Sequence, residues 1–174
     1  MKKRRSVLGG VVLSGGEPCL YGDLPELVKE IKKMSLLVKL DTNGMLPAML
    51  EKLFSRKETL PDYIALDLKL SPSRYSELIP AAAAENADTF NPAEALIKSA
   101  ELIRESGINH EFRSLLLPSV LWPSIPGSSV SEAVYYFSEK DIQALTPLAG
   151  NSPWFFRPFQ SGNCLDPAWN NLEN

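Results

Sequence analysis

A short apolar strand that runs directly into a glycine turn and an acid is the most constraining feature of this chain. Val-Val-Leu-Ser-Gly-Gly-Glu occupies residues 11–17, and Pro18 follows it. Two glycines let backbone N–H and C=O groups approach a ligand without a Cβ in the way, and a carboxylate beside them can receive a cationic group. The pattern therefore predicts a ligand-binding turn at the end of a strand.

Short apolar runs alternate along the whole chain with segments of helical periodicity. Strands are expected at 11–14, 36–41, 63–68, 110–117 and 154–159, and helices at 23–34, 45–54, 91–106, 131–137 and 139–149. Residues 71–89 fit either a short helix or a loop, and 118–130 is expected to be irregular. The alternation is typical of parallel β/α units. We therefore predict an α/β fold, an incomplete (β/α) barrel of parallel strands, as a single domain over residues 1–174.

Two of the expected helices begin with capping signals. Asp23 followed by Glu26 predicts a capping box, and Leu27 is expected on the apolar face of that helix. Asn91 followed by Pro92 and then an acid predicts the start of a later helix. These signals set the expected starts of the two helices.

Three acids recur at intervals of one β/α unit. Glu17, Asp41 and Asp67 each lie at or just past the C-terminal end of an expected strand. Active sites of parallel barrels are assembled at that end, so three acids in register indicate a site, although one such acid alone is more typical of a solvated turn or a helix cap. Lys69 follows Asp67 by two residues, which on an extended segment places both side chains on one face.

Three motifs together resemble the radical S-adenosylmethionine (SAM) superfamily. They are Ser-Gly-Gly-Glu at 14–17, Leu-Asp-Thr-Asn-Gly at 40–44 and Ala-Leu-Asp-Leu-Lys at 65–69. The likeness is to the small activating enzymes of anaerobic ribonucleotide reductase, of pyruvate formate-lyase and of related glycyl-radical enzymes. It covers most of the chain and is specific at the level of the superfamily.

The resemblance implies roles for individual residues. The Gly-Gly-Glu turn would bind the amino group of SAM, and Lys69 would pair with its carboxylate. Asp41 and Asp67 match positions that help bind a monovalent cation in pyruvate formate-lyase activating enzymes. Arg113 would contact the carboxylate or ribose of SAM, or else pair structurally with a neighbouring acid. The expected SAM-binding residues are Ser14, Gly15, Gly16, Glu17, Asp41, Asn43, Asp67, Lys69 and Arg113.

The cysteine content departs from the family pattern. Relatives hold a [4Fe–4S] cluster on an N-terminal C-x3-C-x2-C loop, whereas this sequence contains two cysteines, Cys19 and Cys164. We therefore expect a radical SAM core that lacks its first strand and cluster loop, with no metal ligands or catalytic residues of its own and no SAM cleavage. Its first strand would then have an open edge. Cys19 and His110 are expected to be structural.

The resemblance also implies cofactors and partners for the complete protein. These are SAM, a [4Fe–4S] cluster, an electron donor such as flavodoxin or ferredoxin, and anaerobic ribonucleotide reductase or a related glycyl-radical enzyme. A net charge of −3 gives no reason to expect nucleic acid, and no apolar run reaches the ~18 residues of a membrane span. Two widely separated cysteines favour a cytoplasmic location.

Two other classes of function remain open from the residues alone. Glu17, Asp41 and Asp67 form a carboxylate set that suits Mg²⁺ in a barrel hydrolase or lyase, with Lys69 holding an anionic substrate. The absence of a cysteine triplet is also compatible with a non-catalytic remnant that only binds a partner.

Overall fold

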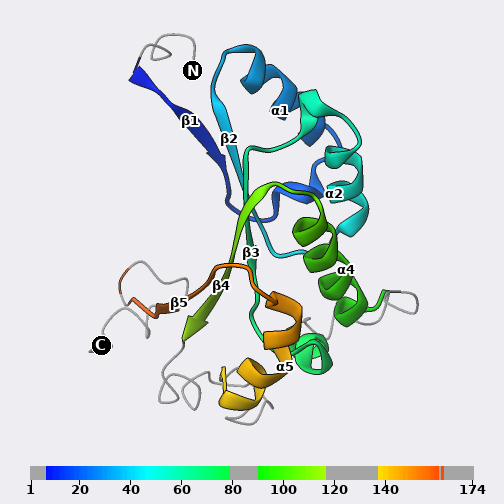
Figure 1. The fold of residues 1–174 in the computed structure, drawn as a ribbon, viewed down its shortest axis with the longest axis vertical. Helices are drawn as coiled ribbons and strands as arrows, with labels where there is room; N and C mark the ends of the chain where they lie inside the picture. Colours follow the sequence, from blue (N-terminus) through cyan, green and yellow to red (C-terminus); the bar gives the residue numbers. More distant parts are fainter. Residues whose placement is uncertain (1–6, 79–89, 117–136, 161, 163–174) are drawn as a thin grey trace.

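A computed structural model describes residues 7–78, 90–116, 137–160 and 162. One five-stranded sheet organises them, and each strand pairs in parallel with the next along the chain (Figure 1). The strands are β1 (Gly10–Leu13), β2 (Leu37–Thr42), β3 (Tyr63–Asp67), β4 (Asn109–Leu116) and β5 (Trp154–Pro158). The helices are α1 (Leu24–Lys33), α2 (Pro47–Phe54), α4 (Pro92–Glu105) and α5 (Glu139–Ala149), with short 3₁₀ turns η2 (Pro18–Leu20), η3 (Lys57–Thr59) and η4 (Pro72–Leu78). The predicted α/β fold with parallel strands in sequence order is confirmed.

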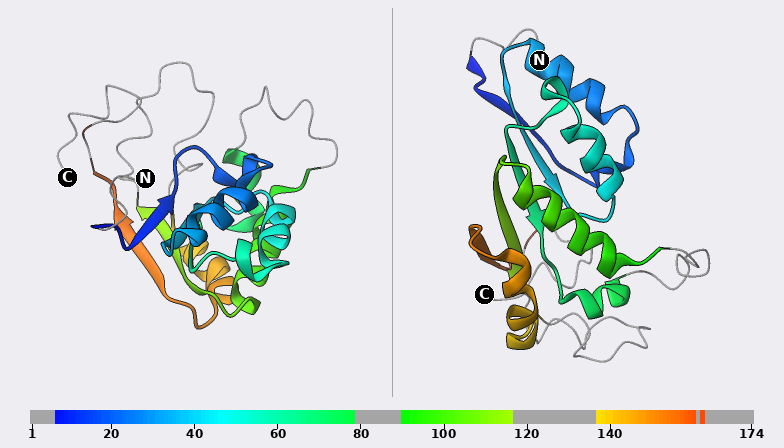
Figure 2. Two further views of the ribbon diagram at one scale, coloured as in Figure 1. Left: turned by 90° about the horizontal axis from the view of Figure 1, so that it is seen from above. Right: turned by 45° about the vertical axis from the view of Figure 1, so that its right-hand side comes forward.

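The helices all lie on one side of the sheet (Figure 2). Alternate residues of β2 show the result, because Val38 and Leu40 are fully buried under the helices whereas Lys39 and Asp41 are only partly buried on the other face. Successive strand side chains point to opposite faces, and a right-handed β/α crossover returns each helix to the same side. The sheet therefore has a helical face that forms the core and an open face on which polar side chains gather.

The start of α1 differs from the prediction. Asp23 is the N-cap residue, but its backbone is not extended (φ −92°, ψ 3°) and its side chain makes no capping hydrogen bond. A capping carboxylate needs an extended backbone to reach the first free N–H groups, so the predicted capping box with Glu26 is wrong. Leu27 is also not on the buried face, since it is 46% exposed while Leu24 and Val28 pack against the sheet.

The other predicted helix start is confirmed. The Oδ1 of Asn91 accepts hydrogen bonds from the N–H groups of Ala93 (3.1 Å) and Glu94 (3.3 Å). At the other end the chain leaves α4 through Gly107, whose φ of 71° favours glycine. Observed element boundaries agree with the predicted ones to within one or two residues for the five strands.

Some sequence predictions fall outside the described residues. These are the irregular segment 118–130, the part of 71–89 beyond Leu78 and nearly all of the helix expected at 131–137, of which only Phe137 is described and is not helical. Within 71–89, Pro72–Leu78 forms the 3₁₀ turn η4. No helix in the described ranges is long and apolar enough to cross a membrane.

A buried carboxylate joins η4 to α5. Asp141 is 1% exposed and accepts hydrogen bonds from the N–H of Ser71 (2.9 Å), the guanidinium of Arg74 (2.7 Å) and the N–H of Ser138 (2.9 Å). Burial alone would raise the pKa of Asp141, but the hydrogen bonds from Ser138 and Ser71 outweigh it, so the pKa is lowered. This single side chain fixes the segment after β3 against the start of α5.

Replacing this carboxylate tests its structural role. We expect Asp141→Asn to lower the free energy of unfolding at neutral pH by roughly 1–3 kcal/mol, because the charged acceptor of four hydrogen bonds, from Ser71, Arg74 and the N–H and hydroxyl of Ser138, is lost. A lowered native pKa stabilises the fold above the unfolded pKa and stops doing so as pH falls through the native pKa, so the difference from wild type should shrink on acidification. Urea unfolding at several pH values measures it. Glu139→Gln, in the same helical turn, is the control, and an equal loss there would contradict the role of Asp141.

Candidate functional site

The glycine turn lies at the carboxyl end of β1 with open space around it. Gly15 and Gly16 have φ values of 91° and 54°, which L side chains rarely adopt. A Cβ added at either glycine would meet no atom within 4 Å, so close packing is not what requires glycine here. Ser14 and both glycines are exposed. The turn is therefore held in a conformation that presents backbone groups to an incoming ligand.

Glu17 secures this turn rather than standing free beside it. Its side chain is 8% exposed. Oε1 accepts hydrogen bonds from the N–H of Cys19 (3.0 Å) and the hydroxyl of Thr42 (2.8 Å), and Oε2 accepts one from the N–H of Asn43 (2.7 Å). The carboxylate thus ties the turn after β1 to the end of β2. Ligand contacts at this turn consequently fall to its exposed backbone.

Asn43 and Cys19 complete this junction. The Oδ1 of Asn43 accepts a hydrogen bond from the N–H of Met45 (2.9 Å), which shapes the turn that leads to α2. The thiol of Cys19 lies 3.6 Å from the hydroxyl of Thr42, and burial raises the pKa of Cys19 to about 12. A thiol held protonated is a poor metal ligand and nucleophile, as expected of a structural cysteine.

A second cluster occupies the open face at the ends of β2, β3 and β4. The guanidinium of Arg113 lies between two carboxylates: Nη1 contacts Oδ2 of Asp41 at 3.2 Å, while Nη2 and Nε contact Oδ1 of Asp67 at 2.9 and 3.1 Å. Burial alone would lower the pKa of Arg113, but the charges of Asp67 and Asp41 outweigh it, so the pKa is raised. Of the two roles expected for Arg113, the structure shows the pairing with neighbouring acids.

Arg113 leaves one oxygen of Asp41 without a partner. Oδ1 of Asp41 is buried and accepts no hydrogen bond from any described residue. The ammonium of Lys39 lies 3.8 Å from it, beyond hydrogen-bonding distance. A buried carboxylate oxygen without a donor is costly, so this atom is an acceptor available to a ligand.

Sequence reasoning missed the continuation of this network across the sheet. The ammonium of Lys39 contacts Oε1 of Glu111 at 3.1 Å, and the hydroxyl of Tyr63 donates to Oε2 at 3.0 Å. Burial alone would raise the pKa of Glu111, but hydrogen bonds from Lys39 and Tyr63 outweigh it and lower the pKa. The available signal was the two-residue spacing of Lys39 from Asp41 and of Glu111 from Arg113, which marks one polar face.

Lys69 reaches the same region through the loop after β3. Tyr75, which is buried, pins this loop because its hydroxyl accepts a hydrogen bond from the N–H of Lys69 (2.9 Å) and donates one to the carbonyl of Asp67 (3.1 Å). A cavity of about 490 Å³ lies here, lined by Asp67, Lys69, Arg113, Ser114, Leu115 and Arg157. The expectation that Asp67 and Lys69 face one space is confirmed, and Arg157 is a member that the sequence did not reveal.

The three acids in register do not form one site. Glu17 bonds to Thr42 on the helical face, whereas the preceding residue, Asp41, points to the open face with Asp67. Among the described residues, no group of three or more histidine, cysteine, aspartate or glutamate side chains could hold a metal ion. The magnesium alternative therefore lacks its carboxylate set in this part of the chain. His110 is structural, since its ring nitrogens lie 2.7 Å from the carbonyl oxygen of Ile108 and 2.8 Å from the hydroxyl of Ser152.

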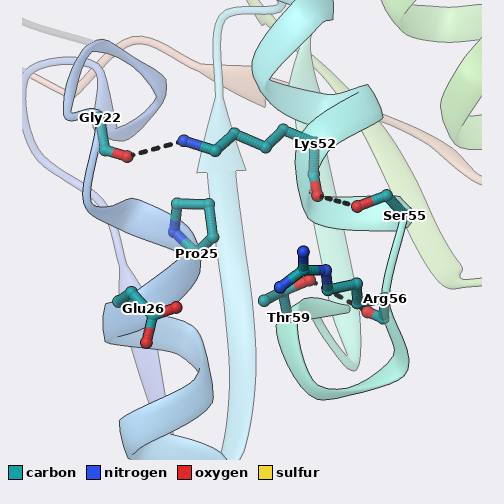
Figure 3. A pocket seen from close by; sticks show the side chains of 7 residues that line it. All are labelled: Gly22, Pro25, Glu26, Lys52, Ser55, Arg56 and Thr59. Carbon is teal, nitrogen blue, oxygen red and sulfur yellow. Dashed lines mark hydrogen bonds between the residues drawn. The ribbon is translucent and has the colours of Figure 1, made fainter.

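Two further cavities flank the sheet. One of about 290 Å³ adjoins the glycine turn and is lined by Leu13, Ser14, Gly15, Pro18, Tyr21, Asp23, Leu24 and Leu27. The other, of about 170 Å³, lies in the helical layer between α1 and the α2–η3 segment, where Lys52 donates to the carbonyl of Gly22 at 3.1 Å (Figure 3). Glu26 and Arg56 lie on opposite sides of this cavity (Figure 3). None of the expected site residues lines it.

Parallel strands in sequence order and helices on one face of the sheet define a partial (β/α) barrel, with polar side chains gathered at the carboxyl ends of its strands. Residues 1–124 match the family model of the radical SAM superfamily, and the chain belongs to this superfamily.

One curated protein and two solved structures are similar to this chain. A protein of Methanocaldococcus jannaschii named as a glycyl-radical enzyme activating enzyme is 31% identical over 112 residues, which are 64% of this chain and 44% of that protein. This chain thus spans less than half the length of that relative. The crystal structure of archaeal TYW1 shares the fold, with 20% identity and a TM-score of 0.51 over 81% of this chain and 38% of that one. A domain of a pyruvate-formate lyase-activating enzyme from Bacteroides vulgatus aligns with 16% identity and a TM-score of 0.47, over 86% of this chain and 99% of that domain.

The superfamily implies SAM and a [4Fe–4S] cluster in a complete protein, and the described residues fit these two groups differently. The exposed glycine turn, the orphan oxygen of Asp41 and the cationic cavity suit a small ligand that carries both an amino group and a carboxylate. The cluster needs thiolate ligands, and Cys19 is a buried thiol with a raised pKa. The described residues therefore fit SAM and do not fit the cluster.

Removing the carboxylate of Glu17 tests the junction beneath the glycine turn. In Glu17→Gln an amide N–H₂ group replaces one carboxylate oxygen, and it would face N–H and O–H donors that need an acceptor. We therefore expect a loss of roughly 1–3 kcal/mol in the free energy of unfolding. Urea unfolding monitored by circular dichroism measures it. Glu26→Gln on α1 is the matched control, expected to leave stability essentially unchanged, and equal losses in both variants would argue against the junction.

Removing the guanidinium of Arg113 tests the bridge between the carboxylates. Arg113→Met should destabilise the fold by roughly 2–4 kcal/mol, since it leaves Asp67 without a cation and Asp41 with only the ammonium of Lys39, at 3.8 Å. Arg113→Lys keeps the charge, but a single ammonium cannot contact both acids as the guanidinium does. The loss of stability in this variant should therefore be intermediate. Unfolding midpoints of the two variants, with Arg56→Met as control, give the ranking. A Lys variant no better than the Met variant would contradict a charge-based role.

Proposed function

We propose that this chain is the SAM-binding part of a radical SAM activating enzyme. In its complete form that enzyme would generate a glycyl radical on anaerobic ribonucleotide reductase or a related glycyl-radical enzyme. The observation that carries the proposal is the placement of an exposed, positive-φ glycine turn and a cationic cavity at the same, carboxyl edge of one parallel sheet. The name of the Methanocaldococcus jannaschii relative supports the choice of reaction.

Each expected residue has a role in this proposal that its contacts support. The exposed carbonyl groups of the Ser14–Gly16 turn would accept the amino group of SAM, and Lys69, whose ammonium has no ion-pair partner among the described residues, would hold the carboxylate. Glu17 and Asn43 would act as positioning residues, because their side chains bond to the chain itself. Arg113 would hold Asp41 and Asp67 in place.

The rest of the SAM molecule meets acceptors on the open face. Among the described residues, Oδ1 of Asp41 has no hydrogen-bond donor. The contacts of Arg113 with Asp67 both go to Oδ1, which leaves Oδ2 of Asp67 without a hydrogen-bond partner in the same part of the chain. Two such oxygens suit hydroxyl donors or a cationic group of the ligand. SAM supplies a sulfonium whose C–S bond is the one broken in this class of chemistry, while these residues bind and orient the molecule.

We also propose the setting in which this chain operates. The partner would be a glycyl-radical enzyme, with flavodoxin or ferredoxin as the electron donor, in the cytoplasm. The chain is proposed to fold as one domain over residues 1–174, without nucleic acid or membrane as a partner. The two widely separated cysteines and the net charge of −3 support the compartment and the lack of nucleic acid.

Calorimetric titration of the full chain with SAM tests the proposal. Wild type should bind, and Lys69→Met should bind about tenfold more weakly, since a charge-assisted contact with the carboxylate is lost. Lys52→Met, which removes a lysine from the helical-layer cavity of Figure 3, is the control and should bind as wild type does. Absence of binding by wild type would reject the SAM site and favour the non-catalytic alternative, while equal affinities would reject the role of Lys69.

A further inference from the structure

Strand β5 brings a second free cation to the cavity that contains Lys69. Strand β5 lies beside β4 (Figure 1), with Arg157 opposite Leu115 and Phe155 opposite Arg113 in the register of the two strands. Residues two apart on a strand share a face and lie roughly 6.5 Å apart, so Arg157 stands one step beyond Arg113 toward the carboxyl end. It lines the cavity together with Lys69.

The charges around this cavity are not balanced by the described residues. Its lining contains three cations, Lys69, Arg113 and Arg157, and one carboxylate, Asp67. Arg113 already pairs with Asp67 and Asp41, so the negative charge of Asp67 is balanced by Arg113. Lys69 and Arg157 make no ion pair within the described ranges. Two positive charges therefore face a cavity of about 490 Å³ to which the described residues contribute no counter-charge for them.

Arg157 is held in a fixed place without being neutralised. Its guanidinium lies over the ring of Phe155, 5.8 Å from the centroid. A cation–π contact of this kind orients the guanidinium plane while leaving its N–H groups free to donate. A guanidinium oriented in this way can donate two parallel hydrogen bonds to the oxygens of a carboxylate or phosphate, whereas the nearby ammonium of Lys69 acts as a point charge.

We propose that Arg157 and Lys69 form an oxyanion-binding pair, with Arg157 as the residue that gives it geometric specificity. This goes beyond the proposed function, which assigns the carboxylate of SAM to Lys69 alone. The shared chemistry is a planar or tetrahedral oxyanion. Its source is either the carboxylate of SAM or a phosphate group of a separate ligand.

The test compares Arg157→Gln with wild type in two titrations of the full chain. Inorganic phosphate binding is followed by phosphorus NMR at low ionic strength, and SAM binding by calorimetry with and without phosphate. Arg56→Gln is the matched control, because Arg56 also lines a cavity beside a lysine (Figure 3). Arg157 is exposed and makes no ion pair with any residue that the structure describes, and thermal melts should show that all three proteins fold alike.

The expected result is that Arg157→Gln weakens at least one of the two ligands about tenfold while Arg56→Gln weakens neither. A loss for SAM, with phosphate competing against SAM in wild type, identifies the carboxylate of SAM as the oxyanion. A loss for phosphate alone identifies a separate anionic ligand. The pair is rejected if Arg157→Gln binds both ligands as wild type does, or if wild type binds neither.

The phosphate arm keeps the two proposals distinguishable. A wild-type chain that binds phosphate through Arg157 but does not bind SAM would support the oxyanion pair and reject the proposed function. If wild type and Arg157→Gln bind SAM equally and neither binds phosphate, the proposed function is supported and the oxyanion pair is rejected.

Discussion

Two carboxylates can lie side by side at the ends of neighbouring strands here because the guanidinium of Arg113 lies between them. Parallel pairing places Arg113 opposite Asp67 and within reach of Asp41, two strands away. Without a cation, like charges at this separation would disfavour one another, and Asp41 is too buried for water to compensate fully. The open face of the sheet thus depends on one ion pair network, and the geometry of the site follows from it.

The alternation of side chains in β2 explains why two acids that resemble each other in sequence have different tasks. Thr42 lies on the helical face and receives Glu17, while Asp41, one residue earlier, lies on the open face and receives Arg113. A period of two in a strand makes neighbouring residues belong to different environments. Glu17 is consequently part of the scaffold beneath the glycine turn, and Asp41 is part of the ion-pair network on the open face.

The sequence was sufficient for the strands and for the edge of the sheet at which the site lies. Covered parallel strands are short apolar runs, and the acids and glycines that follow them mark their carboxyl ends. It was insufficient wherever a side chain's partner is distant. The contact of Lys39 with Glu111 spans 72 residues, and the two-residue spacings that mark a polar face do not reveal which side chains pair on it. The helix that starts after Asp23 was placed correctly, but its predicted capping box failed for a different reason, since capping depends on a backbone conformation that residue type alone does not specify.

The network also separates charge along the strands. Asp41, Asp67 and Glu111 are paired with Lys39 and Arg113 within the sheet, which leaves that region with one negative charge in excess. Lys69 and Arg157 lie toward the carboxyl end and add two positive charges at the cavity. Interactions in a partly enclosed cavity are screened less than on an open surface, so this polarity acts on any ligand that enters. A ligand with an anionic group and separate hydrogen-bond donors is favoured in one orientation, with its anion at the cationic end and its donors toward the free oxygens of Asp41 and Asp67.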